Sequence, residues 1–488
     1  MGKKKKLKIS LVASEISPLA KTGGLADVAG ALPKYLSRDK ELEIIALMPF
    51  YKEVKKKNLP LSPIVEKSEL NWPGKEKIFS LFEYQAEGFK IYLIKNDYYY
   101  NRDYLYGTPQ GDYEDNAQRF AFFCLASLQA MKLLNFQPDL IHGHDWQAAL
   151  TFAYCRHLPG SDDFFKKTSS LFTVHNLAYQ GIFPKETLEE VGLPAALFNP
   201  EDLEFYGKVN FLKAGLLYSE AISTVSPTYS QEIQTPEFGY GLDGVLRKRK
   251  ERLFGLLNGI DYQEWNPQTD PALPAHYSKE NLTGKSVCRK ELLAAFNFPG
   301  NSRQPVIGMV SRLAGQKGFD LLLDSLDELF KRKINLIILG TGEQKIQDQL
   351  LEAKKKYPDR FGLKIAFDDR LARLIYAGSD YFLIPSRYEP CGLTQMYSLR
   401  YGTIPIVRST GGLRDSVQEF QAATLTGNGF LFTDYQPSSL VAAVDRALYF
   451  YQQEPFWSKL LVNAFQSDFS WERRATEYKN LYLKILNF

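Results

Sequence analysis

One pattern occurs twice in the chain and restricts its possible folds more than any other. It consists of a short apolar run, a glycine-containing loop, a helical repeat of apolar residues and a second apolar run. The first copy covers residues 7–50 and includes "LKISLVAS", "KTGG" and "LEIIALMPF"; the second covers residues 305–340 and includes "PVIGMVSRL", "AGQKG" and "INLIILG". The apolar runs do not alternate with polar residues, which is typical of strands covered on both faces of a parallel sheet. The pattern predicts βαβ units and an α/β fold.

Further apolar runs follow the second copy, and the segments between them are long enough for crossover helices but too long for hairpin turns. The sequence therefore predicts two doubly wound domains, the first covering residues 1–255 and the second covering residues 256–470. A last helical pattern occupies residues 471–488. A chain of 488 residues, of which 44% are hydrophobic, is long enough to give each domain a sizeable core.

Composition argues against several classes of protein. The four cysteines are far apart and form no CxxC pair, which favours a reducing compartment over a disulfide framework or a structural zinc site. The apolar run after the basic start is too short for a secretion signal, and no run approaches the ~18 apolar residues of a membrane span. A net charge of +4 is small for this length, and the lysine runs are typical of solvated faces. We expect a cytoplasmic protein with no nucleic-acid or membrane partner.

The polar residues that follow the predicted strands are candidates for a ligand site, because open parallel sheets bind ligands outside the carboxyl ends of their strands. Lys21 lies in "KTGG", where free backbone N–H groups and a helix start are suited to an anion, although a plain glycine turn is the alternative. Arg312 and Lys317 in "SRLAGQKG" are suited to a diphosphate, with solvated charge as the alternative. Glu389 in "SRYEPCG" places a carboxylate between a strand end and a helix start.

Three histidines also follow predicted strands. His142 and His144 precede Asp145 in "LIHGHDW", and His175 lies in "TVHN". Such a group is compatible with a metal site, but spacing alone does not define one, and we favour hydrogen bonding to a polar, uncharged ligand. Signatures of dinucleotide-dependent oxidoreductases and P-loop enzymes are missing from the sequence, since no G-x-G-x-x-G follows the first strand and "GKS" lacks the upstream glycine.

Taken together, the motifs resemble the bacterial glycogen synthase and plant starch synthase family. They run in order from about residue 8 to residue 432. They are "KTGGLADVAGALPK", "HGHDWQAAL", "TVHNLAYQGIF", "LLNGID", "SRLAGQKGFDLL", "RLIYAGSD" and "PSRYEPCGLTQMYSLRYGTIPIVRSTGGLRD". The resemblance implies a GT-B fold, in which two Rossmann-like domains face each other across an interdomain cleft. The acceptor-side domain would be residues 1–255, the nucleotide-sugar domain residues 256–470, and the C-terminal helix, residues 471–488, would cross back onto the first.

The resemblance also implies an activity. The family transfers glucose from ADP-glucose to the non-reducing end of an α-1,4-glucan such as a glycogen primer, with retention of configuration and with neither a metal ion nor a cofactor. The alternatives are a starch synthase with the same chemistry and a catalytically inactive glucan-binding paralogue. An inactive paralogue would be expected to lose Lys21, Glu389 or the Arg312 and Lys317 pair, and all are present. The lack of a transit-like segment favours a glycogen enzyme.

The family's functional residues map onto positions of this sequence. The resemblance implies catalytic roles for Glu389, Arg312, Lys317 and His175, with Glu389 stabilising positive charge on the transferred glucose. It implies substrate contacts from Lys21, Gly24, Asp27, Asp145, Asn258, Phe367, Cys391, Gly392, Leu393 and Thr394. Backbone N–H groups of the last three would meet the distal phosphate.

Two positions distinguish this chain from related sequences. Tyr397 stands where many retaining GT-B enzymes carry a second glutamate, as is usual in the synthase family. Phe367 stands where close relatives often carry tyrosine, so its ring can stack on adenine but donates no hydrogen bond. Because no second acid stands out near Glu389, we favour a front-face mechanism, with a transient covalent intermediate as the alternative.

Overall fold

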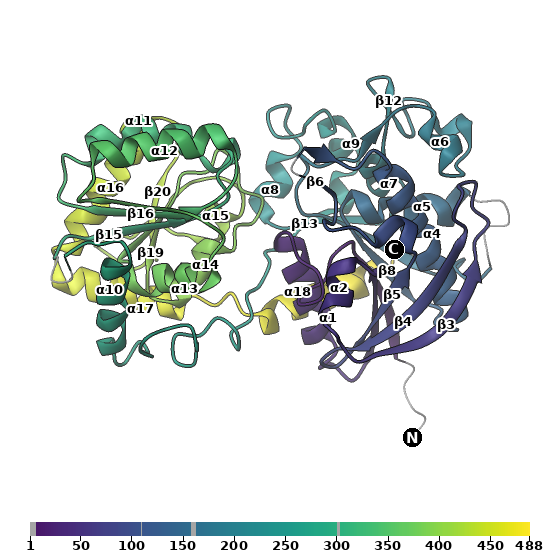
Figure 1. The fold of residues 1–488 in the computed structure, drawn as a ribbon, viewed down its shortest axis with the longest axis horizontal. Coiled ribbons are helices and arrows are strands. Elements are labelled where there is room, and N and C mark those ends of the chain that lie inside the picture. Colours follow the sequence, from purple (N-terminus) through teal and green to yellow (C-terminus); the bar gives the residue numbers. More distant parts are fainter. Residues whose placement is uncertain (1–5, 109, 158–162, 300–302) are drawn as a thin grey trace. The chain divides into compact units, whose positions relative to one another are not determined.

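The computed structural model describes residues 6–108, 110–157, 163–299 and 303–488. The chain divides into two compact units, and each is described by itself (Figure 1). Unit 1 comprises Met1–Val225, Ser230–Leu256 and Trp471–Phe488, and unit 2 comprises Ser226–Tyr229 and Leu257–Ser470.

Unit 1 is built on a nine-stranded sheet. In sheet order its strands are β14 (Leu253–Gly255), β13 (Ala221–Thr224), β9 (Ser169–Val174), β8 (Leu140–His144), β1 (Leu7–Val12), β2 (Leu42–Pro49), β5 (Lys90–Lys95), β4 (Ile78–Gln85) and β3 (Leu61–Glu69). The strands from β14 to β5 are parallel, as the apolar runs predict, whereas β4 and β3 extend the sheet as antiparallel edge strands.

Helices and two small sheets complete unit 1. The helices are α1 (Gly24–Leu36), α2 (Lys52–Lys56), α3 (Asp97–Tyr100), α4 (Asn116–Leu133), α5 (Trp146–His157), α6 (Thr187–Glu190), α7 (Phe211–Tyr218), α9 (Asp243–Lys248) and α18 (Trp471–Ile485), with 3₁₀ turns η1 (Ala195–Leu197) and η2 (Lys250–Arg252). The short strands are β6 (Gly107–Thr108), β7 (Gly111–Asp112), β10 (Ile182–Phe183), β11 (Glu204–Phe205) and β12 (Lys208–Asn210). Helix α8 (Pro227–Glu232) starts in the segment that belongs to unit 2.

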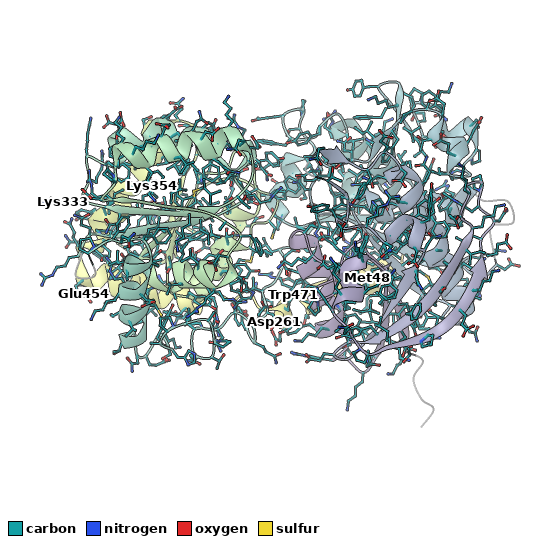
Figure 2. The ribbon with its side chains drawn as sticks, viewed as in Figure 1. Met48, Asp261, Lys333, Lys354, Glu454 and Trp471 are labelled. Carbon is teal, nitrogen blue, oxygen red and sulfur yellow. The ribbon has the colours of Figure 1, made fainter. Side chains whose placement is uncertain are left out.

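The last helix, α18, packs onto unit 1 against α1 and β9. Its buried residues Trp471, Tyr478, Tyr482 and Ile485 recur at helical spacing and form one apolar stripe. Figure 2 labels Trp471 together with Met48 of β2, and both side chains are buried in this unit. The helical pattern of the sequence predicts the helix, and burial of this stripe explains why it is held there.

Unit 2 contains a six-stranded, fully parallel sheet. In sheet order its strands are β17 (Phe361–Ile365), β16 (Asn335–Gly340), β15 (Val306–Val310), β18 (Tyr381–Ile384), β19 (Ile404–Arg408) and β20 (Phe430–Phe432). Its helices are α10 (Thr283–Ala295), α11 (Phe319–Leu329), α12 (Gln344–Lys356), α13 (Asp369–Gly378), α14 (Thr394–Arg400), α15 (Gly411–Ser416), α16 (Pro437–Tyr451) and α17 (Glu454–Gln466), with a 3₁₀ turn η3 (Gly315–Lys317). Figure 1 shows α11 and α12 on one face of this sheet and α10 and α13 on the other.

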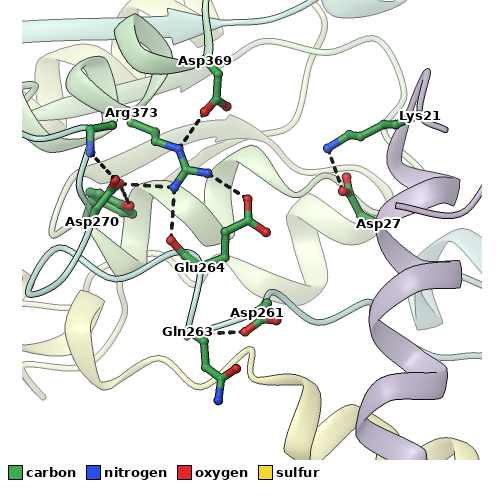
Figure 3. A network of polar contacts seen from close by, with 10 residues as sticks. Lys21, Asp27, Asp261, Gln263, Glu264, Asp270, Asp369 and Arg373 are labelled. Atoms are coloured by element: carbon green, nitrogen blue, oxygen red, sulfur yellow. Dashed lines mark hydrogen bonds and ion pairs between the residues drawn. The ribbon is translucent and has the colours of Figure 1, made fainter. Parts of the chain in front are cut away.

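The segment that opens unit 2 is fixed to the sheet's helices by one arginine. Arg373 of α13 bonds the carboxylates of Asp369, Glu264 and Asp270 at 2.9, 2.8 and 3.3 Å (Figure 3). Its guanidinium also lies 4.0 Å from the centre of the Trp265 ring. These contacts anchor the segment around Glu264 and Asp270 to α13 within unit 2.

The parallel strands of each sheet have one place where the order of strands along the chain reverses. In unit 1 it lies between β1 and β8, and in unit 2 between β15 and β18. Ligands of doubly wound sheets bind at such switch points, outside the carboxyl ends of the strands. No described helix has the length and apolar composition of a bilayer-spanning segment.

Candidate active site

The loop after β1 in unit 1 is organised by a glutamate that the sequence does not single out. Glu15 is 3% exposed and accepts hydrogen bonds from the backbone N–H of Thr22 and, at 2.9 Å, from its hydroxyl. Burial raises the pKa of Glu15 to about 7, although the bonds from Thr22 oppose the rise. The expectation that "KTGG" offers free backbone N–H groups is thus wrong at Thr22, whose N–H is already bound.

The lysine of this loop has a carboxylate partner. Lys21 Nζ lies 2.7 Å from Asp27 Oδ1 of α1, and Figure 3 shows the two side chains directed at each other. Burial raises the pKa of Asp27, and the nearby ammonium group opposes that rise. The lysine side chain is 49% exposed, so the ion pair is weak and an incoming anion can compete for the lysine. Gly24 lies beside this pair as the first residue of α1.

The loops after β8 and β9 bring Asp145 and His175 together. Asp145 has a backbone φ of +57°, a conformation that aspartate tolerates better than most residues, and its Oδ1 accepts the N–H of His175 at 2.7 Å. Burial raises the pKa of Asp145 to about 7. Burial lowers the pKa of His175 to about 3, so this imidazole is neutral at physiological pH. The pair therefore offers hydrogen bonds rather than a positive charge.

The two histidines of β8 are held by hydrogen bonds. His142 uses both ring nitrogens, one on the hydroxyl of Tyr482 at 2.8 Å and one on the hydroxyl of Thr173 at 2.6 Å. His144 Nδ1 lies 3.0 Å from His175 Nε2. Both nitrogens of His142 are thus bonded to side chains of the protein, so the predicted hydrogen bond to a ligand is wrong for His142. The described residues contain no cluster of three or more potential metal ligands.

The switch point of unit 2 carries a compact charged pocket. Lys317 Nζ lies 2.6 Å from Glu389 Oε2, and the hydroxyl of Ser386 donates to the same oxygen at 3.0 Å. Glu389 Oε1 has no hydrogen bond within the described part of the chain. With Arg312 and Thr394, these groups line a pocket of about 150 Å³. The loops after β15 and β18 thus place a carboxylate beside cations, with one carboxylate oxygen free to meet a ligand.

Backbone packing fixes the two loops against each other. The Arg387 N–H donates to the carbonyl of Gln316 at 2.8 Å, and the Gln316 amide donates to the carbonyl of Tyr388 at 3.1 Å. Gly318 has a φ of +74°, and a Cβ there would lie 2.0 Å from the carbonyl oxygen of Pro385. Only glycine allows this approach, which places Lys317 next to Glu389.

The other predicted residues are distributed as follows. Cys391 is buried, while Gly392, Leu393 and Thr394 are half-buried before and at the start of α14. Phe367, after β17, is 91% exposed, which leaves its ring open to stacking. Asn258, in unit 2, is 4% exposed, and its amide oxygen has no hydrogen-bond partner among the described residues.

The structure gathers the predicted residues into groups within each unit. Unit 1 brings together Lys21 with Asp27 and Asp145 with His175, and unit 2 brings together Arg312, Lys317, Glu389 and Thr394. Sequence reasoning missed the roles of Glu15, Gln316 and Ser386. All three follow a strand, which is the signal that would have drawn attention to them, but their partners become visible only when the loops are folded.

Comparisons with known proteins agree with this geometry. The family described as "Starch synthase catalytic domain" matches residues 8–248, and the family "Glycosyl transferases group 1" matches residues 294–452. Glycogen synthases of Syntrophotalea carbinolica and Thermosipho melanesiensis are each 45% identical to the chain; the alignments cover 98% and 99% of it and 99% of each relative.

Similarity to solved structures supports the same family. The catalytic domain of starch synthase IV from Arabidopsis thaliana, bound to ADP and acarbose, is similar with a TM-score of 0.90 and 32% identity, covering 99% of this chain and all of that one. Sucrose-phosphate synthase from Thermosynechococcus elongatus shares the fold, with a TM-score of 0.59 and 17% identity. The chain therefore has the GT-B fold and belongs to the glycogen synthase and starch synthase family of glucosyltransferases.

Proposed function

We propose that this enzyme transfers glucose from ADP-glucose to the non-reducing end of an α-1,4-glucan, with retention of configuration, as a glycogen synthase. The relatives named glycogen synthase cover nearly its whole length, and the similar starch synthase binds ADP and acarbose. Glycogen rather than starch as the product is favoured by the bacterial relatives at 45% identity. The four cysteines are free, which suits a reducing, cytoplasmic setting.

The observation that carries this proposal is the pairing of Lys317 and Glu389 in one pocket with Arg312. Cleaving a glycosyl phosphate bond leaves negative charge on the diphosphate and develops positive charge on the sugar ring. A site for this reaction needs cations at the leaving group and a carboxylate at the ring. Lys317 and Arg312 would hold the diphosphate, and Glu389 would stabilise the ring through Oε1.

The Lys317–Glu389 contact has a second consequence for the reaction. While the lysine bonds Glu389, each charge partly neutralises the other. A bound diphosphate draws the ammonium group towards its own oxygens, and the carboxylate then exerts more of its charge on the sugar. Donor binding would in this way strengthen the group that stabilises the transition state, which is the interaction that raises kcat.

The number of carboxylates distinguishes between the two mechanisms that retain configuration. Among the described residues that line the pocket, Glu389 has the one carboxylate, whereas double displacement needs a nucleophile as well as an acid–base group. We infer a front-face reaction. The acceptor hydroxyl oxygen bonds the anomeric carbon as the carbon–phosphate oxygen bond breaks, and its proton passes to the departing phosphate oxygen.

The remaining predicted residues take supporting roles in this proposal. Lys21 would exchange Asp27 for a donor phosphate, and the neutral ring of His175 would bond the transferred sugar. Phe367 would stack on adenine, with its ring exposed for that purpose. Asn258 would use its unpartnered amide oxygen to accept a hydrogen bond from a substrate hydroxyl. Gly392, Leu393 and Thr394 would meet the distal phosphate through backbone N–H groups, with Cys391 packed behind them.

A direct assay tests the proposal. Purified protein is incubated with glycogen and either ADP-glucose or UDP-glucose, each labelled in the glucose, and the label incorporated into polymer is measured. We expect incorporation from ADP-glucose and α-1,4 linkages in the product. A glucan-binding paralogue without catalysis would retain glycogen in a pull-down but incorporate no label from either donor, and that result would refute the proposal.

A further inference from the structure

The hydrogen bond between His144 and His175 is the feature from which we draw a further inference. His144 ends β8 and is fully buried, while His175 follows β9 and is half-buried. His144 Nδ1 lies 3.0 Å from His175 Nε2, and the ring centres are 5.3 Å apart. Two imidazole rings joined this way share one proton on the axis between them, provided that both rings are neutral.

Both rings are neutral in the folded protein. Burial lowers the pKa of His144 well below its usual range, with neighbouring His142 and His175 adding to the effect, and burial lowers the pKa of His175 to about 3. Only two arrangements then remain. Either His144 Nδ1–H donates to His175 Nε2, or His175 Nε2–H donates to His144 Nδ1.

The surroundings of His144 distinguish the two arrangements. His144 Nε2 is buried and has no hydrogen-bond partner among the described residues. If His175 were the donor, the proton of His144 would lie on this nitrogen as a buried N–H without an acceptor, a group that folded proteins rarely contain. If His144 is the donor, its Nδ1–H is satisfied by His175, and only an unprotonated nitrogen stays without a partner. The arrangement with His144 as donor leaves no buried donor unpaired.

The choice of donor also determines which nitrogen of His175 carries the proton. Because its Nε2 accepts, the ring must carry its proton on Nδ1. That nitrogen has no hydrogen bond within the part of the chain that the structure describes. We propose that His144 is a positioning residue that holds His175 in its Nδ1–H tautomer, so that His175 presents a hydrogen-bond donor to a neutral sugar oxygen.

The fold keeps His144 in place for this role. Its ring packs against that of His142 with centres 4.1 Å apart, and His142 is in turn bonded to Tyr482 of α18 and to Thr173 of β9. Thr173 continues the chain of hydroxyl contacts to Ser223 of β13. All members are buried, so the ring of His144 has little freedom to rotate away from His175. The same buried positioning of a ligand histidine by a second polar group is common at metal and catalytic sites.

The tautomer can be measured directly in the unliganded, full-length protein. The chain has five histidines, so long-range ¹H–¹⁵N spectra of protein labelled in histidine give few signals, and His144→Asn and His175→Asn spectra assign them. We expect protonated Nδ1 and unprotonated Nε2 for His175 at pH 7.5. A protonated Nε2 on His175 would overturn the proposal, and this reading does not depend on any variant folding.

Three variants test whether His144 sets the tautomer. His144→Phe keeps a ring of similar shape but cannot donate, and we expect His175 to change to a mixture that includes protonated Nε2. In His144→Asn the side-chain amide can donate to His175 in place of Nδ1, so the wild-type tautomer should return. Tyr482→Phe removes a hydroxyl from the same cluster without touching the His144–His175 bond, and it should leave the His175 signals unchanged. An unaltered His175 tautomer in His144→Phe would show that His144 does not control it.

The consequence for turnover rests on the proposed function, and it is measured separately. We expect His144→Phe to lower kcat with ADP-glucose about tenfold, as a lost hydrogen bond to the reacting sugar would, and His144→Asn to recover most of it. Affinity for ADP alone should change less than twofold, because His175 would contact the sugar. An altered tautomer with unchanged kcat would overturn the catalytic part of the inference and the role proposed for His175, while equal losses in kcat and ADP affinity would indicate a merely structural residue.

Discussion

At the scale of single residues, the charges of the pocket in unit 2 are interdependent. Lys317 and Glu389 side chains are 19% and 9% exposed, so removing one leaves the other charge in a poorly hydrated place. Arg312 is exposed and has no such dependence. Substitutions at these positions should therefore separate a loss of catalysis from a loss of stability.

The first prediction concerns the cations. Arg312→Ala and Lys317→Ala should each lower kcat by roughly 10²-fold or more, because each removes a charge that stabilises the departing diphosphate. Lys317→Ala should also lower the melting temperature, because it leaves the carboxylate of Glu389 without its cation. Arg312→Ala should not lower the melting temperature. Lys331→Ala, which removes an exposed lysine paired with Glu328, serves as the control and should match the wild type in both measurements. Activities within a few-fold of wild type in both site variants would contradict the diphosphate assignment.

The second prediction concerns Glu389. The nearly isosteric Glu389→Gln removes the charge but keeps a group that can still bond Ser386. We expect kcat to fall far more than the affinity for ADP-glucose. The melting temperature should stay close to that of the wild type, because the amide oxygen of glutamine can still accept a hydrogen bond from Lys317, which Lys317→Ala takes away from Glu389. Turnover, calorimetric donor binding and thermal unfolding on one preparation check this. If the variant unfolds, or if binding falls as much as turnover, Glu389 is a structural or ground-state binding residue.

The third prediction concerns pH. The folded pKa of Glu15, about 7, exceeds its ordinary value of 4.5, so the folded state binds this proton more tightly than the unfolded state. Its contribution to the unfolding free energy is therefore complete below about pH 4.5 and is lost as the pH rises through 7, by up to about 3 kcal/mol. Denaturant unfolding at pH 5 and pH 8 should show a smaller loss for Glu15→Gln than for wild type. Glu251→Gln, at an exposed position, should behave as wild type, and equal losses in all three proteins would refute the assignment.

The sequence predicts the principal charged residues of the site because each follows a strand, and strand ends converge at a switch point. Glu389, Arg312 and Lys317 could be found in that way. The sequence could not show that Lys317 bonds Glu389, since 72 residues separate them and the contact depends on the packing of Gly318 on Pro385. Nor could it show that Thr22 is held by Glu15, which depends on the path of the loop between them.

At the scale of elements, the apolar runs and the helical repeats between them correctly predicted strands and helices of the two sheets. The predicted run "INLIILG" forms β16 (Asn335–Gly340), and the helical repeat between "AGQKG" and this run forms α11 (Phe319–Leu329). The antiparallel strands β3 and β4 were not predicted. They form the sheet edge, where β3 has no buried residue, so the sequence lacks the continuous apolar run that marks a covered strand. The helix at the C-terminus was predicted from its periodicity, but its packing partner was implied only by the family resemblance.

The fourth prediction belongs to this last helix. Trp471 is 2% exposed at the start of α18, so Trp471→Ala should lower the unfolding free energy by roughly 3–5 kcal/mol through lost burial and a residual cavity. Tyr449→Ala, where the ring is 59% exposed, is the matched control and should change stability by no more than about 0.5 kcal/mol. Denaturant unfolding of both variants measures the difference. Equal stability of the two variants would mean that α18 contributes little to unit 1.

At the scale of the whole molecule, the proposed reaction relies on side-chain cations rather than on a metal ion. The fifth prediction is that glucose transfer from ADP-glucose continues at its full rate in excess EDTA. The protein is dialysed against chelator and assayed with and without added Mg²⁺ or Mn²⁺. A loss of activity that either ion restores would mean that a metal takes part and that Arg312 and Lys317 do not suffice.

The assignment of Trp471–Phe488 to unit 1 has a consequence for synthesis of the protein. The first 256 residues leave the ribosome long before the helix that completes their fold, and Leu257–Ser470 must be translated in between. At 5–20 residues per second this delay lasts roughly 10–40 seconds. Throughout it the nascent chain lacks Tyr482, so His142 has no hydroxyl for its Nδ1 and the stripe that α18 covers is exposed. A prematurely terminated chain can thus finish its second unit but not its first, and its uncovered apolar surface marks it for chaperones or proteases.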